Sequence, residues 1–217
     1  MSYKRSMTSM IKKRFETFAI ENGFHFHKPT ILARINEHVI HIINFDVLTL
    51  GFNCSIAIQP LYVPLDNIAL NCGNRLNDFR VNIPGNWGYG TSVEQDLDEV
   101  EALLRENAVP WFDEVGNPQG LVKFIEEEER VNLLTVGFAP FFRTLYLGLS
   151  LIFVDKVDEG IHLLGEIFKH PQEYNSIWFT KWKETIDPLF KPGINVDEAR
   201  TILSEFSQYS RGKIGMK

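Results

Sequence analysis

The spacing of apolar residues changes along the chain and predicts where its elements lie. Residues 6–22 carry apolar side chains at every third or fourth position, which predicts one amphipathic helix ending at Asn22-Gly23. From residue 24 to residue 58 apolar and polar residues alternate. A period of two predicts three or four β-strands joined by short turns, hence an antiparallel meander. A further short strand is expected over residues 68–72.

Helical spacing returns after residues 73–90, a stretch rich in Asn, Gly and Pro that predicts turns rather than a packed element. The capping box over residues 91–94 predicts a helix start, and Asn107 to Pro110 predicts the end of that helix. The remaining apolar spacing predicts helices over residues 120–129, 141–153, 161–168, 177–186 and 195–209, followed by a basic, frayed tail at 211–217.

Strands grouped before helices favour the α+β class. We expect an N-terminal helix, an antiparallel meander of four or five strands and an all-helical C-terminal half. Residues 1–130 form the expected α+β domain, and residues 131–217 form a helical region packed on it, in the same domain or a separate one. The apolar run from Leu133 to Val154 contains Pro140 and Arg143, so it predicts a buried helix and no membrane association.

The composition of the chain indicates the cellular compartment to expect. The 217 residues are 44% hydrophobic and carry a net charge of −6, which is typical of a globular protein. The first residues lack the apolar run of a signal peptide, so a cytoplasmic setting is expected. The two cysteines, Cys54 and Cys72, are either buried thiols in a reducing compartment or one bridge.

Several enzyme classes are disfavoured because their motifs are missing. The chain has no G-x-x-x-x-G-K-[ST] phosphate loop, no H-E-x-x-H zinc motif, no G-x-S-x-G elbow and no C-x-x-C pair. No catalytic motif replaces them. The sequence therefore favours a protein that is not an enzyme, and it indicates no cofactor.

Four of the six histidines lie within residues 25–41. His25 and His27 share one face of a strand, and Asp46 or Cys54 could join them as metal ligands from neighbouring strands. The alternative is a half-solvated sheet face on which histidine is tolerated. For an enzyme or a small-ligand site, the candidate residues are His25, His27, His41, Asp46, Arg75, Trp87 and Tyr89.

The glycine-rich segment over residues 85–90 precedes a predicted helix start, where backbone N–H groups attract phosphate. Glu94 and Asp96 already place negative charge in the first turn of that helix and would repel a phosphate. The favoured interpretation is a connection held in place by Trp87 and Tyr89.

Charge is segregated along the chain. Residues 1–20 hold five basic residues and one acidic residue, whereas residues 94–129 hold twelve acidic and two basic residues. An acidic region can steer a basic protein partner, and it disfavours nucleic-acid binding by that half. The alternative is a solvated helix face that maintains solubility. Candidate interaction residues are Glu126, Glu127, Glu128 and Glu129.

Aromatic residues offer a second candidate interaction surface. Trp178 and Trp182 are one helical turn apart and share a helix face. Such a pair either fills a core or forms part of an exposed interface. In a structural scaffold, the interface of an oligomer would include both tryptophans, so a monomer and a homodimer both remain open.

Several segments resemble a bacterial family, the domain of unknown function 4304. They are Gly23-Phe24, the strand HVIHIINFD, the segment FNCSIAIQPLYVP, the short NRL segment, the Trp87 region and VPWFDE. The resemblance covers roughly residues 8–130. It implies a fold and a bacterial cytoplasmic setting, and it supplies no catalytic residues.

These observations favour a non-catalytic protein-interaction module of an immunity or regulatory type. Its acidic region, residues 94–129, would face a basic protein partner. The alternative is an enzyme, or a protein that binds a small ligand or a metal at a site on the face of the sheet.

Overall fold

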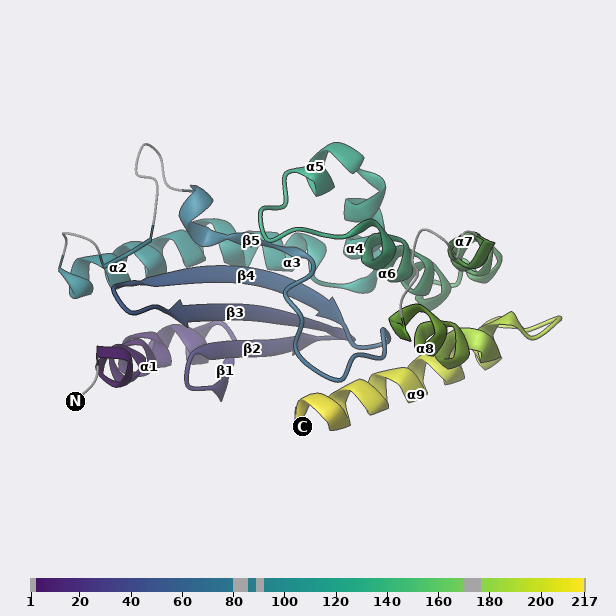
Figure 1. Ribbon diagram of the computed structural model, residues 1–217, viewed down its shortest axis with the longest axis horizontal. Helices are drawn as coiled ribbons and strands as arrows, with labels where there is room; N and C mark the ends of the chain where they lie inside the picture. Colours follow the sequence, from purple (N-terminus) through teal and green to yellow (C-terminus); the bar gives the residue numbers. More distant parts are fainter. Residues whose placement is uncertain (1–2, 80–85, 89–91, 170–176, 217) are drawn as a thin grey trace.

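The computed structural model describes residues 3–79, 86–88, 92–169 and 177–216. An N-terminal helix, α1 (Tyr3–Glu21), precedes a five-stranded antiparallel sheet with strand order β1-β2-β3-β4-β5, and helices make up the remainder (Figure 1). The predicted α+β class is therefore confirmed. The strands are β1 (His25–Lys28), β2 (Ile31–Asn36), β3 (Val39–Val47), β4 (Phe52–Pro60) and β5 (Gly73–Arg75).

Short helices link the sheet to a larger helical region. A 3-10 turn, η1 (Leu76–Phe79), follows β5. The helices that follow it are α2 (Val93–Leu103), η2 (Leu104–Ala108), α3 (Val109–Val115), α4 (Pro118–Glu126), α5 (Glu128–Asn132), α6 (Pro140–Phe153), α7 (Val157–Lys169), α8 (Ile177–Ile186), η4 (Asp187–Phe190) and α9 (Val196–Ile214). In Figure 1, α6, α7 and α8 gather beyond one end of the sheet, α5 lies above the strands, and α9 runs back toward them.

The alternation of side chains gives the sheet two distinct faces. The front face carries Leu32, Ile43 and Ile56, which are directly opposite one another on β2, β3 and β4 and belong to the main core. The back face carries Ala33, Ile42 and Ala57, which belong to a smaller cluster. Helices α1, α2 and α3 supply buried side chains to the front core, whereas the back cluster is completed by the end of α9.

Helix α1 follows its predicted amphipathic pattern. Met7, Ile11, Phe15 and Phe18 recur at helical spacing and are all buried. The ring of Phe15 lies 4.8 Å from that of Phe45 on β3, which fixes the helix on the front face. The predicted end at Asn22-Gly23 is also confirmed, because Gly23 takes the left-handed conformation with φ of 71°.

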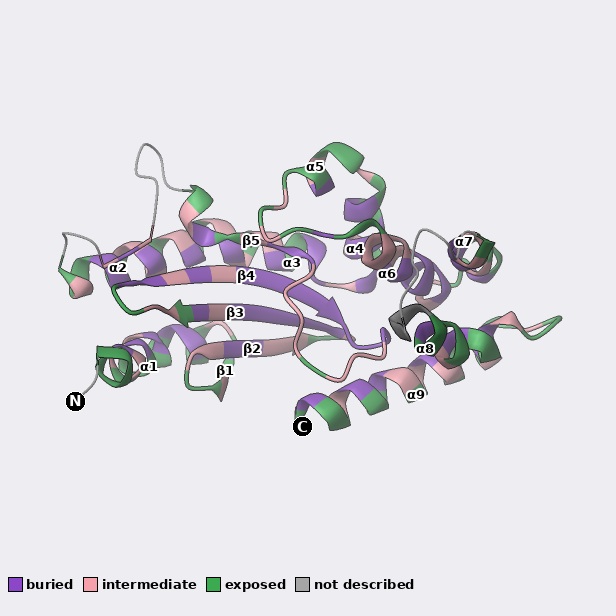
Figure 2. Cartoon of the chain, in the orientation of Figure 1, coloured by how far each residue is buried: buried purple, intermediate pink, exposed green. Residues whose placement is uncertain are grey.

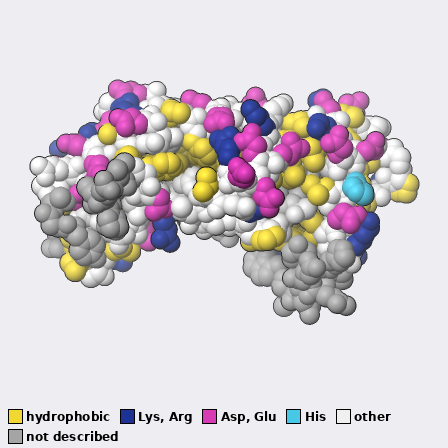
Figure 3. All heavy atoms as spheres, turned by 90° about the horizontal axis from the view of Figure 1, so that it is seen from above, with side chains coloured by type: hydrophobic (Ala, Val, Ile, Leu, Met, Phe, Trp, Pro, Cys, Tyr) yellow, Lys and Arg dark blue, Asp and Glu magenta, His cyan; other side chains and the backbone are white. Residues whose placement is uncertain are grey.

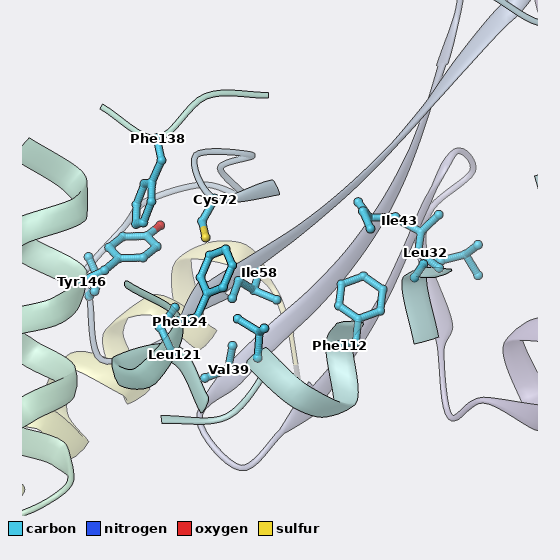
Figure 4. Packing of buried hydrophobic residues seen from close by; sticks show 14 of the residues in the cluster. Leu32, Val39, Ile43, Ile58, Cys72, Phe112, Leu121, Phe124, Phe138 and Tyr146 are labelled. Carbon is cyan, nitrogen blue, oxygen red and sulfur yellow. The ribbon is translucent and has the colours of Figure 1, made fainter. Parts of the chain in front are cut away.

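The front core continues beyond the sheet. Figure 4 shows Phe112 of α3 lying against Leu32 and Ile43, and Tyr146 of α6 lying near Cys72. One continuous cluster of buried residues thus extends from α1 to α9. Cys54 and Cys72 are both free and fully buried, and burial raises the pKa of each thiol.

The short strand lies later in the chain than the spacing predicts. Residues 68–72 form no strand, and β5 begins at Gly73. A β-carbon at Gly73 would lie 2.1 Å from the carbonyl oxygen of Ile56 and 2.8 Å from Cα of Ala57, so the close approach of this strand to β4 requires glycine. The expectation of turns at the start of the 73–90 stretch is also wrong, because β5 and η1 occupy residues 73–79.

Pro110 does not end the helix that begins at Val93. Helix α2 passes directly into the wider π-helical turn η2 and then into α3, with Pro110 near the start of α3. Proline lacks an N–H group and its ring crowds the carbonyl of the preceding turn. A local π-helical turn widens the backbone at this point, which lets the chain continue as a helix.

Other helices also have boundaries that differ from prediction, among them α7, which begins at Val157 and not near residue 161. The predicted 120–129 helix begins earlier, at Pro118, because the Asn117 side chain accepts a hydrogen bond from the Gly120 N–H at 2.9 Å. It breaks at Glu127, which has φ of −85° and ψ of 79°. Helix α9 continues past residue 209 to Ile214.

The basic tail is docked rather than frayed. Ile214 and Met216 are 7% and 5% exposed and pack into the back cluster. Gly215 ends α9 in the left-handed conformation, with φ of 75°. In Figure 2 a buried stripe accordingly follows one side of α9 to its end. Within the described residues, none of the helices combines the length and the apolar character that a membrane span requires.

Candidate functional site

A polar cluster on the front face of the sheet centres on His41 and Arg34, which lie opposite each other on β3 and β2. Arg34 Nε donates to His41 Nδ1 at 2.9 Å, and Arg34 Nη2 donates to Asp113 Oδ1 at 2.6 Å. His41 Nε2 donates to the carbonyl oxygen of Gly116 at 2.6 Å. The cluster therefore ties two strands to the end of α3.

His41 is neutral in this environment. Its ring is fully buried and stacks on Phe112, with the centroids 4.8 Å apart and the planes 6° from parallel. Burial lowers the pKa of His41 from 6.5 to about 4; the hydrogen bond to Gly116 opposes this shift and the charge of Arg34 adds to it. Because Nδ1 accepts from Arg34, the single ring proton lies on Nε2.

The His41 cluster has a structural role. Both ring nitrogens of His41 are engaged within the protein. The Arg34 guanidinium also donates to the Asn22 carbonyl at 3.0 Å and lies 4.9 Å from the centre of the Phe24 ring. His41, a candidate ligand residue by sequence, therefore holds α3 on the front face and offers no open nitrogen to a ligand.

The sheet separates the histidines that the sequence grouped together. His25 is opposite Ala33, on the back face, whereas His41 lies on the front face. Cys54 is opposite Phe45 in the front core, so it cannot join His25 and Asp46 around one metal ion. Over the described ranges, no group of three or more His, Cys, Asp or Glu side chains could hold a metal.

His27 lines a pocket on the back face, which we call the back-face pocket. Its volume is about 330 Å³, and its walls come from β1, β2, β3, the segment after β4 and the end of α9. Burial lowers the pKa of His27, and the charges of Lys28 and His25 lower it further. Asp46 lies on the same face of β3, two residues beyond Asn44. The lining residues are His27, Lys28, Ile31, Asn44, Asn67, Ile68, Leu70, Lys213 and Ile214.

Arg75 and Trp87 do not line a common cleft. Arg75 is exposed on β5, opposite Ser55. Trp87 is 1% exposed, stacks on Phe52 with ring centroids 5.7 Å apart, and donates from Nε1 to Glu99 at 2.8 Å. Tyr89 lies outside the described residues.

The glycine-rich segment holds one of the protein's own carboxylates where a phosphate would bind. The backbone N–H of Gly88 donates to Asp96 Oδ2 at 2.7 Å, and Asp96 is 3% exposed. Trp87 also pairs with Phe52 through two backbone hydrogen bonds of 2.9 and 3.1 Å. This geometry agrees with the interpretation of a connection held by Trp87.

The acidic half contains a groove with an apolar floor, which we call the acidic groove. It has a volume of about 420 Å³ and lies between η1, α3 and the α5 region. Leu133 is 75% exposed and Phe79 is 37% exposed. Seen from above in Figure 3, apolar side chains gather among acidic ones on this face of the molecule. Its lining includes Phe79, Glu106, Asn107, Trp111, Glu114, Phe124, Arg130, Leu133 and Leu134.

The net charge of this groove is set by the partners of Arg130. Its guanidinium donates to Glu114 at 2.8 Å and to Glu127 at 3.0 Å, and it lies 5.2 Å from the centre of the Phe124 ring. The hydrogen bond from Arg130 holds the pKa of Glu114 below its ordinary value. Two carboxylates therefore compensate the one cation. Glu106 adds a further negative charge and forms no ion pair within the described residues.

The four consecutive glutamates do not form one surface. Glu127 pairs with Arg130 beside the acidic groove. Glu126 and Glu128 line a different hollow, together with Arg143. Glu129 is exposed. The helix break at Glu127 separates the directions of these side chains.

Trp182 is largely buried, at 6% exposure, and belongs to the main core. It lines a hollow of about 220 Å³ with Phe142 and Leu65. The side chain of Trp178 lies outside the described residues. Trp182 by itself is therefore a core residue and not an exposed platform.

Comparison of the chain with protein-family models, with curated proteins and with solved structures found no match.

Two features of these sites cannot be predicted from the sequence. They are the apolar floor of the acidic groove and the meeting of two lysines in the back-face pocket. Leu133 stands in an apolar run that predicts burial, yet it is exposed because α6 begins only at Pro140. Lys28 and Lys213 lie near opposite ends of the chain, and only the docking of α9 brings them to one pocket. The basic character of residues 211–217 is the one sequence signal that points to this end of α9.

Proposed function

We propose that this protein is a non-catalytic interaction module whose acidic groove binds a basic segment of a partner protein. The observation that carries the proposal is Leu133, which is 75% exposed beside the carboxylates of the groove. Apolar side chains exposed in a concave site with a polar rim are typical of protein-binding surfaces. The resemblance to a bacterial family supports a setting in the bacterial cytoplasm, with a role of immunity or regulatory type.

The chemistry of the groove selects the kind of partner. Trp111 and Phe124 provide aromatic surface, and tryptophan is among the residues that contribute most to binding energy at interfaces. Glu106 and Glu114 favour Lys or Arg side chains on either side of an apolar anchor. A segment in which one apolar residue lies between basic residues fits both features.

The experiment compares two equally exposed apolar residues. The tagged protein captures partners from a lysate of its own organism, in parallel with Leu133→Ser and Ile20→Ser. Ile20 is also 75% exposed but lies on α1, away from the groove. We expect Leu133→Ser to weaken binding of the partner at least about tenfold, which is near 1.4 kcal/mol, and Ile20→Ser to leave it unchanged.

Two variants that each remove one negative charge extend the same test. Glu106→Gln should slow association, and added salt should reduce the difference from wild type. Glu205→Gln on α9, also exposed and away from the groove, should have no effect. A partner that binds Leu133→Ser and Glu106→Gln as well as it binds wild type would contradict the proposal, as would a lysate in which no protein distinguishes these variants.

A further inference from the structure

Among the described residues, the lining of the back-face pocket includes two lysines and no Asp or Glu, on a protein whose net charge is −6. Lys28 enters the pocket from β1 and Lys213 enters it from the last turn of α9. Neither ammonium group forms an ion pair within the part of the chain that the structure describes. The ammonium of Lys213 instead lies 5.4 Å from the centre of the Tyr209 ring.

Asp66, next to the lining residue Asn67, is already engaged by other groups. Asp66 accepts hydrogen bonds from the Tyr209 hydroxyl and, at 3.1 Å, from Lys181 Nζ. These bonds hold the pKa of Asp66 below its ordinary value, and the charge of Lys213 adds only a small further effect. Asp66 therefore pairs with Lys181, and not with Lys28 or Lys213.

Helix-end electrostatics accounts for only one of the two lysines. A basic residue in the last turn of α9 complements the partial negative charge at a helix C-terminus. That effect explains Lys213. It does not explain Lys28, which comes from a strand at the other end of the sequence and faces the same cavity.

The rest of the lining suits a ligand with one charged end. Asn44 and Asn67 offer amide N–H donors, and neutral His27 retains one N–H donor. Ile31, Ile68 and Ile214 supply an apolar floor beside these donors. A volume of about 330 Å³ lies at the small end of the range for small-molecule sites.

We propose that the back-face pocket binds a small organic anion, with its phosphate or carboxylate group between Lys28 and Lys213 and its apolar part on Ile31, Ile68 and Ile214. This inference does not depend on the acidic groove. Of the histidines on the sheet, it makes His27 a ligand-binding residue together with the two lysines. His41 is not part of the proposed site.

The first experiment measures binding of three probes to the full chain by calorimetry. Phenyl phosphate and benzoate test the two kinds of charged group, and inorganic phosphate tests the charged group without an apolar part. We expect saturable binding of at least one aromatic anion, and at least about tenfold weaker binding of inorganic phosphate, because the floor then stays uncovered. Absence of saturable binding by both aromatic anions would overturn the proposal.

The second experiment tests the location. Lys28→Gln with Lys213→Gln should weaken binding of the better probe at least about tenfold, because both positive charges are removed. Lys12→Gln with Lys13→Gln removes the same charge from the exposed face of α1 and should change the affinity little. Equal weakening by the two double variants would show a general effect of charge and would overturn the assignment to this pocket.

A third measurement separates a local effect from loss of fold. All four lysines are exposed, so both double variants should keep the wild-type free energy of unfolding within about 0.5 kcal/mol. The His27 ring resonances should shift on addition of the probe to wild type, and not on its addition to the Lys28→Gln, Lys213→Gln protein. Unchanged His27 resonances at saturation of wild type would place the ligand elsewhere and contradict the proposal.

Discussion

The two faces of the sheet use similar side chains in opposite ways. On the front face, α3 covers His41 and Arg34. The two side chains form hydrogen bonds with each other and with Asp113, Gly116 and Asn22. On the back face, His27 and Lys28 line an open pocket whose other walls include the segment after β4 and the end of α9.

This difference shows that the type of a polar residue matters less for binding than whether a helix covers it on the face of the sheet. A histidine that is buried with both nitrogens engaged stabilises the fold. His27, in contrast, lines an open pocket together with two lysines. The following substitutions test how far the two faces differ in stability, starting from the largest expected effect.

Phe112→Ala should be the most destabilising change, because it removes the ring that packs on His41, Leu32 and Ile43 of the front face. We expect a loss of about 3–5 kcal/mol in the free energy of unfolding, measured by urea titration. Ile214→Ala on the back face should cost less, about 2 kcal/mol, since this side chain lies at the rim of a smaller cluster. Equal costs at the two positions would contradict the distinction between the faces.

The pH dependence of stability should come in part from His41. In the folded protein its pKa is about 4, below the ordinary value of 6.5, so the unfolded chain binds its proton first as pH falls. Stability should therefore fall between pH 6.5 and pH 4, by up to about 3 kcal/mol from this group.

The measurement is urea unfolding of wild type and His41→Gln at pH 7 and at pH 4.5. The variant should be less stable at pH 7, and its further loss at pH 4.5 should be smaller than that of wild type. His162→Gln, at an exposed position on α7, should keep the wild-type pH dependence. If His41→Gln also kept the wild-type pH dependence of stability, His41 would not be the source of that dependence.

Gly116→Ala should have a smaller effect on the same cluster. A β-carbon there would lie 2.0 Å from His41 Nε2 and 2.4 Å from the Phe112 carbonyl oxygen, so the ring must move. We expect a loss of about 1–3 kcal/mol. Gly212→Ala on α9 meets nothing within 4 Å and should be neutral or stabilising by up to about 1 kcal/mol. Thermal unfolding of the two variants measures whether each substitution lowers or raises stability. Equal effects would show that the contact between the new β-carbon at residue 116 and His41 is relieved without loss of stability.

The sequence predicts those elements whose signal is local. Helix α1 and strands β2 to β4 have long, regular patterns, and each element forms where its pattern indicates. Strand β5 has only three residues, and its position depends on the contact of Gly73 with Ala57, which lies far away in the sequence. The helix through Pro110 depends on a π-helical turn that no spacing of apolar residues indicates.

The candidate sites are less predictable because they are made by tertiary contacts. The sequence offers Asp46 or Cys54 as a neighbour of His25 and His27, and of these two the structure places Asp46 on the face of His25. It cannot show that His41 lies beneath α3, or that Lys213 returns to Lys28. The acidic composition of residues 94–129 indicates a charged region, but only the fold shows that Leu133 and Phe79 form an apolar floor within it.

The docking of α9 on the back face also affects how the protein is made. About 140 residues separate β5 from Ile214, the side chain that completes the back cluster. At the usual speed of a ribosome, those residues take on the order of ten seconds to synthesise. During that interval Ile40 and Ile42 have Leu61, Ile68 and Leu70 of the segment after β4 as neighbours but lack the cover of Ile214 and Met216, so part of this apolar surface is exposed while the chain is being synthesised.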